Sequence, residues 1–156
     1  MMRIAMLVAL ILATALGTTA QAQGDATITG VTVTFITHND NKDNDTAVSF
    51  ILQNKVSMTL TKDIGKLNNF ANNSEFGDNP PSQHSYDLEL ASDNIRVSEL
   101  NVPVFTVEIA PNGHDRWIFD CKITIAASDG SRYTSTTRGI VLDQDNRTYK
   151  GSFSAD

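Results

Sequence analysis

Acidic and amide side chains gather in one short stretch of the chain, residues 38–46. The run reads His-Asn-Asp-Asn-Lys-Asp-Asn-Asp-Thr, and its carboxylates are Asp40, Asp43 and Asp45, with Lys42 as the single counter-charge. Ca²⁺ takes about six to eight oxygen ligands from carboxylates, amides and backbone carbonyls. Like charges this close repel one another unless a cation offsets them. The stretch therefore predicts a calcium site.

Two further acidic turns supply possible co-ligands. Asp143 and Asp145 belong to an Asp-Gln-Asp-Asn turn, and Asp115 lies in a turn before a Trp. Loops at one end of a β-sandwich cluster, so we expect the three turns to share a cation. The EF-hand pattern does not apply, because the central Gly and the final Glu are missing and strands flank the loop. The alternative is a solvated hairpin loop, since Asn and Asp are ordinary turn formers.

Residues that could carry catalysis are scattered along the chain. His38, His84 and His114 do not have the spacing of zinc ligands. The sequence contains no Gly-x-Ser-x-Gly elbow, phosphate loop or dinucleotide-binding glycine motif. Cys121 excludes an intrachain disulfide, because it is the single cysteine, and it falls in phase with Trp117 on an apolar strand face. We therefore expect no enzyme and a buried, inert thiol.

Hydrophobic residues alternate with a period of two along most of the chain, which is typical of strands with one buried face. Gly30 interrupts the first run and predicts a β-bulge. Val56, Met58 and Leu60 continue the phase of the apolar residues at 48–52, so 47–62 is expected to form either one long strand or two strands joined by a tight turn. Turn residues predict hairpins within 102–126 and 139–153 and a further hairpin turn at 128–130, and 131–137 is expected at a sheet edge. The pattern predicts an all-β antiparallel β-sandwich of about eight strands, with strands expected within 26–37, 47–62, 86–90, 102–109, 116–126, 131–137, 139–142 and 147–153.

A polar segment at about 63–83 interrupts this pattern and predicts a long surface loop. Loops of this length in compact domains are usually functional or mobile. Phe70 and Phe76 are its aromatic residues and are candidate partner-binding contacts. A variable excursion without function is the alternative. Trp117, in contrast, lies in phase with Phe119 and is expected in the core.

The first residues and the charge indicate where the protein works. Residues 1–22 have a positive start, an apolar run too short to span a bilayer and a small-residue cleavage site, which predicts a cleaved signal peptide. The remaining 23–156 are expected to form one domain, secreted or periplasmic, without a transmembrane segment and monomeric. The chain has 12 Lys and Arg against 18 Asp and Glu, a formal net charge of −6. Such a charge disfavours nucleic acid as a partner.

Two stretches resemble the PLAT domain, the lipoxygenase-type β-sandwich. Residues 31–34 lead through the acidic loop to 45–48, which is similar to the first strand, calcium loop and second strand of that family. Residues 115–119, followed by 123–125, resemble its Trp-led late strand. Asp45 stands where the family usually has Gly, and the 63–83 segment has no obvious counterpart. The resemblance implies an eight-stranded sandwich that binds calcium through Asp40, Asp43 and Asp45 and docks to lipid or protein.

These observations lead to two hypotheses. The first is a secreted, calcium-dependent binding module of PLAT-like type without catalytic activity, which docks to an unknown protein or lipid surface. The second is an exported structural or protein-binding β-sandwich domain that needs no metal.

Overall fold

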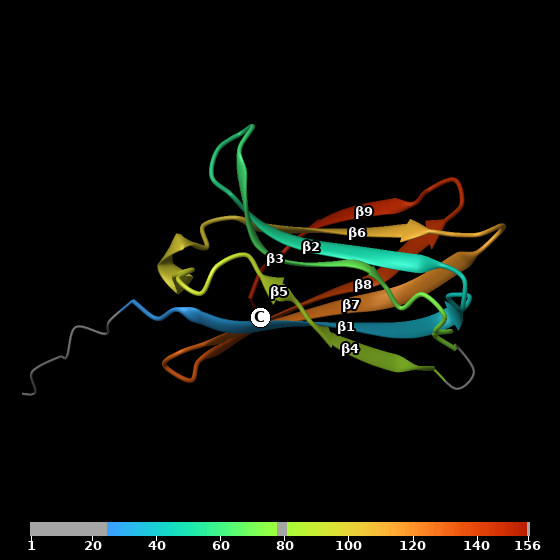
Figure 1. Cartoon of the computed structure of the whole chain (residues 1–156), viewed down its shortest axis with the longest axis horizontal. Coiled ribbons are helices and arrows are strands. Elements are labelled where there is room, and N and C mark those ends of the chain that lie inside the picture. Colours follow the sequence, from blue (N-terminus) through green and yellow to red (C-terminus); the bar gives the residue numbers. More distant parts are fainter. Residues whose placement is uncertain (1–24, 78–80, 156) are drawn as a thin grey trace, which may run out of the picture.

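Two antiparallel sheets pack face to face and form a β-sandwich (Figure 1). The structure is a computed structural model and describes residues 25–77 and 81–155, so the predicted signal peptide lies outside the described residues. One sheet has the order β4-β1-β7-β8 and the other β5-β3-β2-β6-β9. The predicted fold class is confirmed, with nine strands in the described chain in place of eight. The elements are β1 (Ile28–Asp40), β2 (Ala47–Lys55), β3 (Thr61–Phe70), β4 (Gln83–Asp87), β5 (Glu89–Leu90), the 3₁₀ turn η1 (Val97–Glu99), β6 (Pro103–Ala110), β7 (Arg116–Ala127), β8 (Arg132–Asp143) and β9 (Thr148–Ser152).

The apolar faces of both sheets meet in one core. Trp117 is fully buried, stacks on Phe119 with ring centroids 3.7 Å apart, and donates a hydrogen bond from Nε1 to Oγ1 of Thr37 at 3.0 Å. That bond satisfies the indole N–H, which needs a partner when buried. Cys121 is also buried, and burial raises the pKa of its thiol to about 12. Both residues lie where the alternation predicted them.

Two local predictions about the first sheet are confirmed. The pairing of β1 with β7 shifts register between Ile28 and Gly30, which is the expected bulge. Strand β8 lies at the edge of its sheet, next to β7. The tight turn at 128–130 joins these two strands as a true hairpin. No helix among the described residues is long and apolar enough to cross a bilayer.

The two other predicted hairpins are wrong. Strand β6 belongs to one sheet and β7 to the other, and β8 and β9 are likewise divided between the sheets. Their connecting turns therefore cross from one layer to the next. Turn residues predict that the chain reverses, but they do not say which sheet the next strand joins. Whichever sheet the next strand joins, its apolar face packs against the same core.

The predicted loop at 63–83 is wrong in its first half, which forms strand β3 (Thr61–Phe70). This strand pairs with β2 through two register shifts, and only its central Ile64 and Gly65 are fully buried. Bulges interrupt the two-residue period of a strand. Apolar and polar residues therefore do not alternate regularly along β3, and the sequence pattern did not indicate a strand there. The remainder begins with a turn after Phe70 and includes the undescribed residues 78–80.

Gly151 in β9 is predicted to be intolerant of a side chain. A Cβ built there would lie 2.5 Å from two ring atoms of Phe105, which is buried in the core. Gly151→Ala should lower the free energy of unfolding by about 1–3 kcal/mol through overpacking. Gly30→Ala is the control, because a Cβ there meets nothing within 4 Å. Equal urea midpoints for the two variants would contradict this packing.

Candidate functional site: the acidic end of the sandwich

The three acidic turns lie at the same end of the molecule, at the right of Figure 1. Each connects the two sheets: β1 to β2, β6 to β7, and β8 to β9. The backbone N–H of Asp43 donates to Oδ2 of Asp115 at 3.3 Å, which joins the first two turns. Arg116 pairs in register with Asp143, which places the third turn beside the second. The expected clustering of these loops is therefore present.

The centre of the first turn is filled by a side chain of the same turn, Lys42. Lys42 is 0 % exposed, and its Nζ donates to the backbone oxygens of Asp43 at 2.7 Å, Thr46 at 2.8 Å and Ala71 at 3.0 Å. The ammonium group also lies 5.0 Å from the ring centroid of Phe76. Three carbonyl acceptors use the three donors that an ammonium group has.

The backbone after β3 is bent to complete this arrangement. Ala71 has a φ of 56°, in the left-handed region that alanine rarely adopts. This conformation directs a carbonyl to Lys42. A two-way backbone bridge between Lys42 and Phe76, with distances of 3.3 and 3.0 Å, holds the two segments together. The acidic turn and the segment after β3 thus form one unit around the ammonium group.

Charge and burial act in opposite directions at this centre. Burial lowers the pKa of Lys42, while the nearby carboxylates, led by Asp115 and then Asp43, raise it. Asp43 is exposed, but partial desolvation of its carboxylate and the charges of Asp115 and Asp45 raise its pKa. Lys42 therefore acts as the counter-ion of these carboxylates within the chain, although its burial disfavours the charged form.

The predicted metal ligands are engaged separately from one another. Asp40 forms an ion pair with Arg116 at 3.5 Å. Asp143 closes its own turn, since its Oδ1 accepts from the N–H groups of Asp145 at 2.9 Å and of Asn146 at 2.7 Å. The side chain of Asp45 is exposed, as is that of Asp145. Within residues 25–77 and 81–155, no three His, Cys, Asp or Glu side chains are grouped to hold a metal ion.

The oxygen atoms of the first turn do not form a calcium site while Lys42 is in place. The carbonyls of Asp43, Thr46 and Ala71, which have the chemistry of calcium ligands, already accept from Lys42 Nζ. The buried side-chain oxygen of this turn that has no partner is Oγ1 of Thr46, whereas Ca²⁺ requires about six to eight oxygen ligands held together. The ammonium group thus takes the role that the calcium hypothesis assigned to a metal.

The predicted partner-binding aromatics belong to this unit instead. Phe76 is 0 % exposed and stacks on His84 with ring centroids 4.0 Å apart. A wholly buried ring cannot touch a partner, so the prediction for Phe76 is wrong. Phe70 is half-buried and packs against Tyr86 at 4.7 Å. Sequence reasoning missed the role of Lys42, although a lone basic residue inside an acidic run was the available signal.

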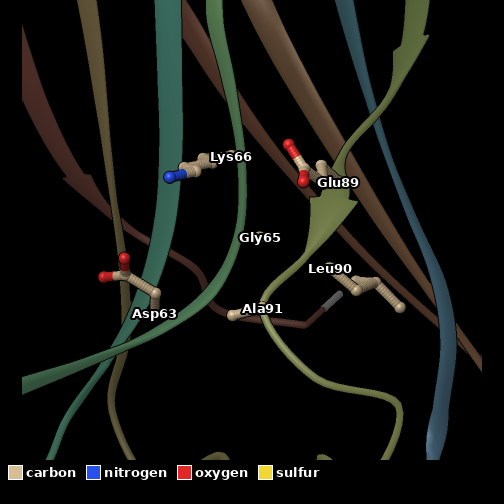
Figure 2. A pocket seen from close by; sticks show the side chains of 6 residues that line it. All are labelled: Asp63, Gly65, Lys66, Glu89, Leu90 and Ala91. Carbon is tan, nitrogen blue, oxygen red and sulfur yellow. The ribbon is translucent and has the colours of Figure 1, made fainter.

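Groups capable of catalysis do not come together elsewhere in the described chain. Nε2 of His38 pairs with Asp120 at 3.0 Å, but the single thiol, Cys121, is buried in the core. A pocket of about 290 Å³ between β3 and β5 holds three charged side chains. Figure 2 shows the charged ends of Asp63, Lys66 and Glu89 standing apart from one another around it. None of these places meets the geometry of a nucleophile with its base.

Comparison with known proteins agrees on the fold. A solved structure of the alpha toxin from Clostridium absonum matches with a TM-score of 0.51 and 14% sequence identity, over 86% of this chain and 33% of the toxin chain. This chain therefore spans a third of the length of the toxin, and the likeness shows the fold alone. No family model matches the sequence. No curated protein matches it either.

Replacing Lys42 is predicted to destabilise the protein strongly. Lys42→Met keeps an apolar stem but leaves three carbonyls without their donor and the carboxylates without a counter-charge. The free energy of unfolding should fall by about 3 kcal/mol or more, as measured by urea denaturation. Lys122→Met, at an exposed position of β7, removes the same charge and should change stability little. Similar losses in both variants would contradict a central role for Lys42.

Proposed function

We propose that this chain is an exported, non-catalytic binding module of PLAT-like type whose acidic end is closed by Lys42 rather than by calcium. The observation that carries the proposal is the buried ammonium group with its three backbone acceptors. A bound divalent cation and an ammonium group cannot occupy the same oxygen cage. The module therefore keeps its loops ordered without a metal.

A binding role is supported by the filled core of the β-sandwich and by its inert thiol. The core between the sheets is filled with aromatic and aliphatic side chains, and its thiol is inert at neutral pH because its pKa is about 12. Binding proteins commonly place recognition on loops and outer surfaces of such rigid sandwiches. Export is supported by the sequence of residues 1–22. The sandwich itself is in keeping with the PLAT resemblance.

The competing hypothesis is calcium dependence, which the convergence of three acidic turns at one end favours. It requires Lys42 to leave its carbonyls so that a metal can enter. The two hypotheses differ in the response of the folded protein to calcium, because a ligand that binds the native state raises its melting temperature.

Calcium is predicted to leave the thermal stability of the protein unchanged. Melting curves recorded with excess Ca²⁺ and with a chelator should coincide, and calorimetric titration should give no binding heat. The closed cage around Lys42 is the reason. A rise in melting temperature that depends on calcium concentration would overturn the proposal and restore the metal-dependent alternative.

Asp43→Asn is predicted to stabilise the protein at neutral pH in the absence of metal. The raised pKa of Asp43 means that between pH 3.8 and that pKa the folded state binds more protons than the unfolded state. Ionised Asp43 therefore costs stability at neutral pH, and this cost disappears as the pH falls below 3.8. The advantage of the variant should fade over the same acid range.

Melting curves of Asp43→Asn and the wild-type protein from acid to neutral pH check this expectation. Asp145→Asn is the matched control, since Asp145 is an exposed carboxylate of another turn at the same end. If calcium bound at this turn, Asp43→Asn would instead lose a calcium-dependent stabilisation.

A further inference from the structure

The tip of the hairpin between β2 and β3 exposes apolar side chains. Val56 is 56% exposed, Met58 94% and Leu60 57%, although they continue the phase of the buried residues of β2. Figure 1 shows this tip projecting upward, away from both sheets, at the ends of β2 and β3 that are remote from the acidic turns. Strand alternation predicts a buried face here, but no second sheet extends this far. Nothing among the described residues covers the tip.

The exposed apolar surface is concentrated at this place. The fourth large hydrophobic residue that is exposed in the described chain is Val102, at 49%. Its carbonyl accepts a hydrogen bond at 2.9 Å from the N–H of Lys55, at the base of the hairpin. Isolated exposed hydrophobics are ordinary, but a cluster on a projecting tip marks a contact surface.

The backbone of the tip is suited to an environment without water. The N–H groups of Val56 and Ser57 donate to the carbonyl of Leu60 at 2.9 and 3.2 Å. The hydroxyl of Ser57 accepts from the N–H groups of Leu60 and Thr59 at 3.2 and 3.4 Å. Unsatisfied backbone groups are what makes loops costly in an apolar layer, and here four N–H groups have partners within the tip.

Positive charge borders the apolar tip. Lys55 and Lys62 stand on the two strands at its base, and Lys62 forms an ion pair with Glu99 at 3.3 Å. A groove of about 630 Å³ beside the hairpin runs over β6 and β9. Its charged lining residues are Lys55 and Lys150, accompanied by hydroxyl-bearing residues such as Thr61 and Ser152. The nearby carboxylate of Asp63 is held by the amide of Gln53 at 2.7 Å. A lysine-lined groove in an acidic protein is complementary to anions.

We propose that the β2–β3 tip docks on an anionic phospholipid surface. Val56, Met58 and Leu60 enter the apolar layer, and Lys55 and Lys150 bind headgroup phosphates in the adjoining groove. Lysines beside an apolar insertion suit a membrane interface, where the stems lie along the apolar layer and the ammonium groups reach the headgroups. A narrow convex tip offers a protein partner much less area than a stable protein interface buries. This proposal names the partner of the binding module proposed above and rests on that function.

Sedimentation with lipid vesicles in the presence of a chelator tests the proposal. The protein should bind vesicles of equimolar phosphatidylcholine and phosphatidylglycerol and bind phosphatidylcholine alone much more weakly. Met58→Asp should weaken binding by about tenfold or more, because a charge enters the apolar layer, while Met58→Leu should preserve it. Lys55→Gln combined with Lys150→Gln should also weaken binding by about tenfold or more.

The matched charge control is Lys122→Gln combined with Arg138→Gln, both at exposed positions of the other sheet. This variant should bind vesicles as the wild-type protein does. Equal binding by the tip, groove and control variants would overturn the proposal. So would failure of the wild-type protein to bind either vesicle. If its melting temperature is also insensitive to calcium, that failure removes lipid docking but leaves the metal-free binding module intact.

Discussion

The structure of the acidic end depends on the hydrogen bonds of one ammonium group. Lys42 joins the carbonyls of its own turn to that of Ala71, so the β1–β2 connection and the segment after β3 form one unit. Phe76 closes this unit against the core, where its ring also contacts Trp117. Burying a lysine is costly unless its donors are satisfied and opposite charges lie near. Here both conditions are met, which explains why so many carboxylates can crowd one end of the fold.

The two ends of the sandwich therefore differ in character. At one end, acidic turns cross between the sheets and bond to one another, to Arg116 and to Lys42. At the other, a hairpin extends apolar side chains into solvent beside a lysine-lined groove. The first end keeps the loops ordered, whereas the second presents a surface that is left uncovered. The bonded acidic turns and the exposed apolar tip therefore lie at opposite ends of strands β2 and β3.

Much of the fold could be predicted from the sequence, because alternation reports directly which face of a strand is buried. This signal located β1 and β7 and placed Trp117 and Cys121 in the core. Alternation failed where bulges shift the register, as in β3, and where alternating apolar residues run on past the end of β2 into the exposed turn, as at Met58. The cage around Lys42 could not be predicted, because one of its acceptors, Ala71, is distant in sequence and is oriented by an unusual backbone conformation. The clustering of acidic turns was predictable, but the identity of their counter-ion was not.

The pairing pattern of the first sheet has a kinetic consequence. Strand β1 lies between β4 and β7, and Val33 in its centre pairs with Tyr86 on one side and Ile123 on the other. The ladder with β4 needs the chain as far as Asp87, and the ladder with β7 needs it as far as Ala127. Contacts so remote in sequence slow folding, because a long loop must close before any of them is made. In a nascent chain of this topology, the first sheet therefore cannot be completed before β7 and β8 have been synthesised.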